Sequence, residues 1–222
     1  MSLRRHHSGM VNSLKLMGRT DQWSRYMTGG GYTDAMEIEN YNVEIQEDDR
    51  DIRMFLWNRK RPCVTMVIDK EDKVAVIDTI EYNPECTVDG RMQRGEGTRD
   101  MITFALKLLK NSGATTVQLT DKSSVVCEGE KIRLGLMYFF KYGQTWYEKY
   151  FGFQPEAKYA ERYAHAKEIQ KTLGLETKPC TYFTNDVLDD LLAETKLVFL
   201  SNIVWEKDLL RPVNTNAVDV IA

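Results

Sequence analysis

The stretch Arg94-Gly95-Glu96-Gly97-Thr98-Arg99 carries the residue types best suited to binding a ligand in this 222-residue chain. Two glycines stand before a strongly helical run, and the first amides of a helix have no partners within the helix. Glycine lets the backbone come close to a ligand, and the helix dipole adds positive charge. Since Arg94 and Arg99 would add cations, the stretch is expected to bind phosphate oxygens. The alternative is a tight turn.

The spacing of these glycines separates the stretch from two well-known nucleotide-binding motifs. It lacks the GxxxxGK[ST] pattern of a P-loop and the GxGxxG pattern of a dinucleotide-binding turn. A nucleotide- or phosphate-binding enzyme that uses the same loop in another way is kept as a weaker alternative.

Two acidic residues, Asp78 and Glu81, fall on the run expected to form the strand before this loop. An amine with a pKa near ~10.4 must lose a proton before it can attack a carbonyl carbon, so a base is needed nearby. A regular strand points these two side chains to opposite faces, and only one of them can serve a given face. The alternative is that either acid ends a strand or pairs with a lysine.

The cysteines and histidines give no pattern that predicts a metal site. No two of the four cysteines have CxxC spacing, so we expect no zinc cluster and no metal cofactor. Free thiols in a reducing interior are the expectation. Cys127, expected in a loop, is a weak candidate nucleophile because no histidine is near it in sequence. His165 is expected on the surface of a helix.

Composition limits the classes of function. Hydrophobic residues make up 42% and charged residues 28%, and the formal net charge is −3. This composition is that of an ordinary globular domain, with no basic field for nucleic acid and no apolar run of the ~18 residues that span a membrane. We expect a cytoplasmic protein, and we leave a homodimer open.

The hydrophobic pattern predicts several strands followed by helices. Strands are expected at 39–47, 51–58 and 114–120, and as a hairpin over 63–82 with the charged tip DKEDK. A helix is expected to follow the glycine loop, and later helices within 135–155 and over 157–173 and 186–200. These elements predict a mixed α/β (α+β) fold: a mostly antiparallel sheet, a β–α–β crossover and a helical C-terminal extension. The predicted organisation is an arm at 1–36, a core at 37–155 and the helical extension at 156–222.

Two segments in this order carry a family resemblance. Arg94–Arg99 resembles the R-G-x-G-x-G/A loop of the GNAT superfamily of N-acetyltransferases, and WYEKYFGFQP (Trp146–Pro155) resembles its aromatic YEKxGF-like segment. The resemblance covers about residues 39–155. It implies a GNAT-like fold that binds acetyl-CoA through its pyrophosphate at Arg94, Gly95, Glu96, Gly97, Thr98 and Arg99. It also implies that the strand before the loop carries a bulge, so the parity of Asp78 and Glu81 does not decide which is the base.

The resemblance also implies that the partner is a small-molecule or peptide amine, which accepts the acetyl group. It gives further residues a role in that transfer. Tyr147 would be the general acid that protonates the leaving thiolate, and the backbone near Val117 and Leu119 would meet the pantetheine arm. The chain departs from the family at Arg99, where a glycine or alanine is usual, and in the long link between Tyr82 and Arg94. It also has helices after Phe153 where strands are expected. A non-catalytic binding or interaction module on the same scaffold is therefore the alternative function.

Overall fold

The computed structural model describes residues 24–28, 31–58, 60–81, 83–90 and 95–210. The chain divides into two compact units: one reaches Gln118 and includes the segment from Asp208, and the other is Leu119–Lys207. This division lies well before the domain boundary expected at residue 155. Most of the arm predicted at 1–36, the end of the predicted extension from residue 211 onward, and the loop residue Arg94 lie outside the described residues.

The first unit is built on a sheet in which strands that follow one another in the chain also pair. Six strands form an antiparallel meander and a seventh continues the order: β1 (Ser24–Thr28), β2 (Gly31–Ile38), β3 (Tyr41–Glu47), β4 (Asp51–Trp57), β5 (Pro62–Asp69), β6 (Val74–Ile80) and β7 (Thr116–Thr120). Apolar residues alternate along β3 and β4, so that every second side chain is buried. The strands predicted from Glu39 to Thr120 are confirmed.

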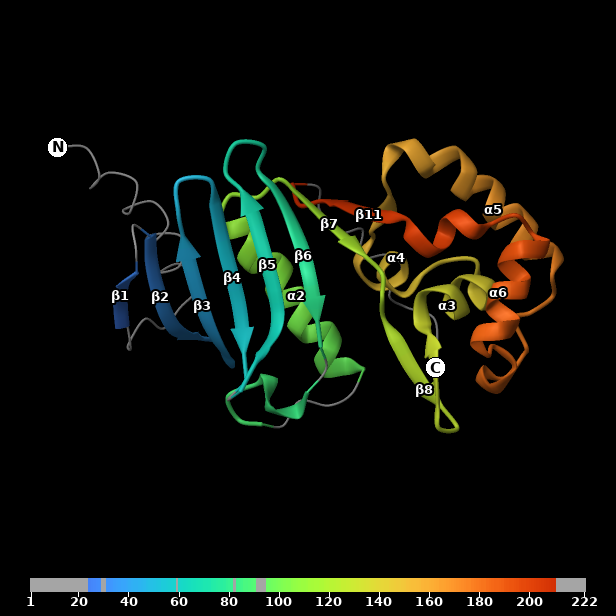
Figure 1. Cartoon of the computed structure of the whole chain (residues 1–222), viewed down its shortest axis with the longest axis horizontal. Coiled ribbons are helices and arrows are strands. Elements are labelled where there is room, and N and C mark those ends of the chain that lie inside the picture. Colours follow the sequence, from blue (N-terminus) through green and yellow to red (C-terminus); the bar gives the residue numbers. More distant parts are fainter. Residues whose placement is uncertain (1–23, 29–30, 59, 82, 91–94, 211–222) are drawn as a thin grey trace. The chain divides into compact units, whose positions relative to one another are not determined.

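Helix α2 (Glu96–Asn111) links β6 to β7 and lies behind the sheet in Figure 1. Its buried side chains recur with helical spacing and include Met101, Phe104 and Leu108. Phe104 stacks on Tyr41 of β3 with ring centroids 4.6 Å apart, so the core of this unit lies between helix and sheet. The amide of Thr115, just before β7, donates to the carbonyl of Lys73, just before β6, at 2.9 Å. The two strands of the β–α–β unit therefore begin side by side.

The N-terminal arm expected over 1–36 is wrong for its last part. Strands β1 and β2 pair antiparallel, with Thr28 opposite Gly31, and β2 then pairs along its length with β3. The sequence favoured a loose segment because of its glycines and polar residues. Pairing with the apolar-patterned strand β3 supplies the backbone hydrogen bonds that such a segment cannot supply by itself.

The second unit is mainly helical. Its α-helices are α3 (Leu134–Tyr142), α4 (Trp146–Phe151), α5 (Ala160–Thr172) and α6 (Asn185–Glu194). Gly143 ends α3 in the left-handed region at φ 71°, and Thr145 and Glu148 form a capping box at the start of α4. The helices expected within 135–155 and over 157–173 are confirmed. The last expected helix, 186–200, ends at Glu194.

Short strands and turns complete the second unit, several of them missed by the sequence prediction. They are the hairpin β8 (Ser124–Cys127) and β9 (Glu130–Arg133), the antiparallel pair β10 (Gln154–Pro155) and β11 (Val204–Asp208), and the 3-10 turns Ala157–Tyr159, Cys180–Tyr182 and Val198–Asn202. With α2 the described residues hold five α-helices and a large, mostly antiparallel sheet, which is a mixed α+β fold. None of these helices combines the length and the apolar character that crossing a membrane requires.

All four cysteines form disulfides, so the prediction of free thiols is wrong. Cys63 pairs with Cys86 in the first unit and Cys127 with Cys180 in the second, with Cα atoms 6.0 Å and 6.2 Å apart. The partners are 23 and 53 residues apart in sequence, and only the folded chain brings them within bonding range. Cys127 ends strand β8 and is no longer a candidate nucleophile.

Candidate functional site

The glycine loop enters helix α2 with a backbone shape that other residues adopt only with strain. Gly95 is the N-cap at φ 85° and ψ −72°, and a glycine has no side chain with which to cap the helix. The amide of Arg99 donates to the Gly95 carbonyl at 3.1 Å, which closes the first helical turn. A Cβ placed on Gly95 would meet no atom within 4 Å, so the space beside the residue is open. The early amides of α2 can therefore donate hydrogen bonds to an external anion.

The other loop residues line the first turn. Gly95 and Glu96 are exposed, whereas Gly97, Thr98 and Arg99 are half-buried. The exposure of Glu96 lets its carboxylate point to solvent rather than at a bound anion. Arg94, the first cation expected here, lies outside the described residues.

Strand β6, which leads toward the loop, contains a β-bulge. Thr65 of β5 pairs with Thr79, but the next residue, Met66, pairs with Ile77. Asp78 is therefore the extra residue and opposes no residue on β5. A bulge bends its strand and re-aims side chains, and the Asp78 side chain is exposed there, with the Thr79 hydroxyl 3.4 Å from its carboxylate.

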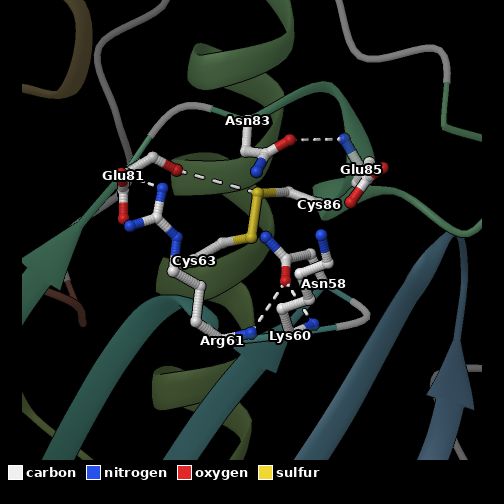
Figure 2. The surroundings of a disulfide bond; sticks show 8 residues. All are labelled: Asn58, Lys60, Arg61, Cys63, Glu81, Asn83, Glu85 and Cys86. Carbon is white, nitrogen blue, oxygen red and sulfur yellow. Dashed lines mark hydrogen bonds and ion pairs between the residues drawn. A yellow bond between two sulfur atoms is a disulfide. The ribbon is translucent and has the colours of Figure 1, made fainter.

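Glu81 lies just after β6 and forms an ion pair with Arg61 at 2.7 Å (Figure 2). Its amide donates to the carbonyl of Cys63 at 2.7 Å, which fixes the backbone at this point. The carboxylate is 41% exposed, so solvent also reaches it. A base in this position must act while its carboxylate is paired with the Arg61 guanidinium.

The long link between β6 and α2 is tied down at several points. The disulfide joins Cys86 of the 3-10 turn Pro84–Cys86 to Cys63 of β5, and the Asn83 side chain caps the same turn at 3.0 Å from the amide of Glu85 (Figure 2). Further along, the amide of Val88 donates to the carbonyl of Asn40 at 2.9 Å. This link, which is longer than in the family that the sequence resembles, is therefore anchored to the sheet.

Tyr147, the predicted general acid, is almost fully buried in the second unit, with 5% of the residue exposed. Its ring packs against Trp146 and Phe153 with centroids 5.2 Å and 5.9 Å away. Burial, and then the negative charge of Asp121, raise the pKa of the Tyr147 hydroxyl, which stays protonated at neutral pH. A protonated hydroxyl is the form that a general acid requires.

The two residues expected beside a pantetheine arm are on strand β7. Val117 and Leu119 are both buried, with 0% and 3% exposed, and the polar residues between and around them are more exposed. Val117 belongs to the first unit and Leu119 to the second. The predicted site residues are thus shared: Asp78, Glu81 and the 95–99 segment lie in the first unit, and Tyr147 lies in the second.

Glu148, next to Tyr147, has a structural role that explains much of the aromatic segment. Its carboxylate accepts from the hydroxyl of Tyr163 at 2.6 Å and pairs with Lys167 at 2.5 Å, and it completes the capping box with Thr145. The proton of Tyr163 is held firmly, because burial and the Glu148 charge raise the pKa of its hydroxyl. These contacts account for the glutamate of the Y-E-K sequence by folding alone, without any catalytic role.

Sequence reasoning missed Asp121, which directly follows β7. One carboxylate oxygen, Oδ1, accepts from the amide of Ser123 at 2.9 Å and from the hydroxyl of the same residue. Burial raises the pKa of the Asp121 carboxyl, and these two hydrogen bonds offset part of that effect. The available signal was an acid at the end of a predicted strand, followed two residues later by a serine.

The described residues contain no group of three or more histidine, cysteine, aspartate or glutamate side chains that could hold a metal ion. The fold and loop define the class only broadly, as a mixed α+β protein with an open glycine turn at a helix start. Comparison of the chain with protein-family models, with curated proteins and with solved structures gives no match.

Proposed function

We propose that the protein is an acyl-CoA-dependent N-acyltransferase of the GNAT type, which transfers acetyl from acetyl-CoA to an amine. The observation that carries this proposal is the entry into α2. Gly95 adopts φ 85°, no side chain caps the helix, and the space beside the glycine is open. Amides left without a partner at a helix start bind phosphate groups, such as the diphosphate of coenzyme A.

The strand before the loop supports the same proposal. The bulge at Asp78 interrupts the regular pairing of β5 and β6. Its place fits the bulged strand that the GNAT resemblance implies. A mixed α+β fold hosts many activities, so acetyl-CoA binding is the direct test of the proposal.

In the proposed reaction the amine nitrogen attacks the thioester carbonyl carbon and forms a C–N bond. The C–S bond then breaks, and the electron pair leaves with sulfur. Glu81 or Asp78 takes the proton that the amine must lose, and the thiolate takes up a proton as it leaves. The role of Tyr147 as the donor of that proton stays a prediction. A cationic acceptor, such as a polyamine or a lysine side chain, agrees with the net charge of −3.

A pair of glycine variants at the two ends of α2 tests the diphosphate site. Gly95 and Gly113 have φ values of 85° and 96°, and neither has an atom within 4 Å of an added Cβ. Alanine at either position should therefore cost a similar stability, about 1 kcal/mol. Acetyl-CoA should raise the melting temperature of the unmodified protein and of Gly113→Ala, and much less that of Gly95→Ala. Equal stabilisation of both variants by acetyl-CoA would show that the diphosphate does not bind at this loop.

The alternative function is a non-catalytic binding module on the same scaffold. Two observations favour it: Tyr147 is buried among aromatic rings, and Glu81 is paired with Arg61. A module of this kind should show no thermal stabilisation by acetyl-CoA at any concentration that stabilises a coenzyme A-binding enzyme. A nucleotide-binding enzyme is the third alternative, for which ATP should stabilise the protein and displace coenzyme A.

The cellular location predicted from the sequence, the cytoplasm, stays a prediction. Disulfides form and persist mainly in oxidising compartments. The two disulfides therefore count against a reducing location. Titration of thiols in protein isolated under thiol-blocking conditions would show whether the cysteines are paired in the cell.

A further inference from the structure

A pocket of about 230 Å³ lies wholly within the second unit. Liquid water takes about 30 Å³ per molecule, so the space suits roughly seven waters or one small organic molecule. Apolar side chains, among them Phe139 and Trp205, form part of its lining, and Asp121 and the hydroxyl-bearing residues Thr145 and Ser201 bring polar groups to it. The pocket therefore combines an apolar wall with a carboxylate, which is the usual make-up of a small-molecule site.

Only one oxygen of the Asp121 carboxylate has hydrogen-bond partners among the described residues. Both hydrogen bonds to Asp121 come from Ser123 and reach Oδ1. The other oxygen, Oδ2, is buried and has no hydrogen-bond partner among the described residues, although the residue as a whole is half-buried. A buried acceptor without a donor is unfavourable, and such groups commonly mark a place where a ligand or water binds.

The neighbouring cations do not supply the missing donor. Arg133 lines the pocket, and its Nη2 donates to Asp189 at 2.6 Å and to the carbonyl of Asn185 at 3.1 Å. Its Nε is buried and has no hydrogen-bond partner among the described residues, so it does not donate to Asp121 either. Lys122 also lines the pocket and is exposed. Tyr147, whose pKa the Asp121 charge raises, is neutral and adds no positive charge. The charge on Asp121 thus has no direct partner on its Oδ2 side.

Gly135, at the start of α3, borders the same oxygen. A Cβ on this residue would lie 2.3 Å from Oδ2, closer than real contacts allow. Only glycine leaves room for Oδ2 in its present position, and both Gly135 and Asp121 line the pocket. The absence of a side chain at Gly135 is thus what allows this position of the Asp121 carboxylate.

We propose that this pocket binds a small organic amine, whose ammonium group donates to Asp121 Oδ2 while its carbon body packs against Phe139 and Trp205. A charged donor suits a buried carboxylate better than a neutral one, because the hydrogen bond and the charge pairing act together. The pocket lies in one unit and the glycine loop in the other, so the proposal does not depend on the acyl-CoA function.

Phenethylamine and 2-phenylethanol test the proposal with the full chain, because they share a carbon body and differ in the ammonium group. Titration of each, followed by amide chemical shifts at pH 7, should show the amine binding at least tenfold more tightly. The shifted amides should lie in the segments 121–123, 133–145 and 200–205. Equal affinity of the two compounds, shifts elsewhere, or no binding of the amine at millimolar concentration would each overturn the proposal.

Two aspartate variants separate the pocket from the overall charge. Asp121→Asn should reduce the affinity for phenethylamine to that for the alcohol, since Asn keeps the acceptor for Ser123 and loses the charge. Asp190→Asn removes the same charge from an exposed position of α6 and should leave the affinity unchanged. Equal effects of the two variants would contradict the proposal, and the comparison of the two compounds on the unmodified chain holds even where Asp121→Asn does not fold.

Acidification gives an independent readout. Burial raises the pKa of the Asp121 carboxyl, so the carboxylate is protonated at a higher pH than an exposed aspartate. The affinity for phenethylamine should fall as the pH drops through that pKa, and the affinity for 2-phenylethanol should not. A pH-independent affinity for the amine would mean that Asp121 is not its partner.

Discussion

The two units of the chain differ in how far apart in sequence their disulfide partners and most of their paired strands lie. In the first unit, each strand from β1 to β6 pairs with the next along the chain, and the disulfide closes a separation of 23 residues. In the second unit, Arg133 reaches Asp189 across 56 positions and the disulfide closes a separation of 53. Local pairing made the first unit easy to predict, and distant pairing hid the contacts of the second.

The candidate groups differ in the same way. Asp78 is exposed and Glu81 is partly exposed in the first unit, where solvent screens their charges. Tyr147 and Asp121 in the second unit have pKa values raised by burial. Substitutions in the first unit should therefore change binding with little loss of stability, whereas those in the second should change both.

The disulfides give the largest expected difference. Loop-closure entropy predicts that Cys127→Ser with Cys180→Ser lowers the free energy of unfolding by about 4 kcal/mol, and Cys63→Ser with Cys86→Ser by about 3 kcal/mol. Urea unfolding followed by far-ultraviolet circular dichroism measures both losses. The reverse order, or no loss in either double variant, would contradict the expectation that the disulfide closing the longer loop contributes more to stability.

Glu148 should show the next largest effect. Its side chain is 10% exposed and holds Lys167 and Tyr163, so Glu148→Ala should cost about 3 kcal/mol of unfolding free energy. Glu168 is a matched control, because it pairs with Lys171 at 2.7 Å but is 68% exposed, and its replacement by alanine should cost under about 0.5 kcal/mol. Similar losses in both variants, measured by urea unfolding, would show that burial is not the deciding factor.

Asp121 should reveal its burial through the pH dependence of stability. The pKa of its carboxyl is raised in the folded state above the ordinary value of 3.8, so its favourable contribution is present below pH 3.8. That contribution is lost as the pH rises through the folded-state pKa. Asp121→Asn should thus gain stability relative to the unmodified protein between pH 3.5 and pH 7, as measured by urea unfolding at each pH. A constant difference would contradict burial of the charge.

Glu81 should show the smallest change in stability. Its ion pair with Arg61 has exposed side chains, so Glu81→Gln should change the unfolding free energy by less than about 1 kcal/mol. The thermal stabilisation by acetyl-CoA should stay the same, because a base does not contact the diphosphate. A loss above about 2 kcal/mol would show that Glu81 helps to fix the turn around the disulfide rather than to serve as a base.

Much of the fold followed from hydrophobic periodicity and from turn and cap residues. The alternation of Tyr41, Val43 and Ile45 predicted β3, the charged tip predicted the β5–β6 hairpin, and Gly143 predicted the break between α3 and α4. The β1–β2 hairpin was missed because its strands carry little apolar alternation and depend on pairing with β3. Strands β8 to β11 were missed because two to five residues are too few for a clear period.

The site was predicted less completely than the fold. The glycine turn could be placed because a helix start and its glycines are neighbours in sequence. Asp121 was missed because its importance depends on burial and on the absence of a donor for Oδ2, and both come from segments distant in the chain. The structural role of Glu148 depends in the same way on Tyr163 and Lys167.

The sequence by itself determined the order of strands β3 to β7 and of the α-helices, the glycine entry to α2 and the charge balance, since each depends on residues a few positions apart. The tertiary structure alone decided the pairing of the cysteines, the bulge at Asp78, and the burial of Tyr147 and Asp121. The physical reason is that disulfide geometry, strand register and desolvation are properties of atoms that meet in space. No local pattern fixes which distant segments will meet.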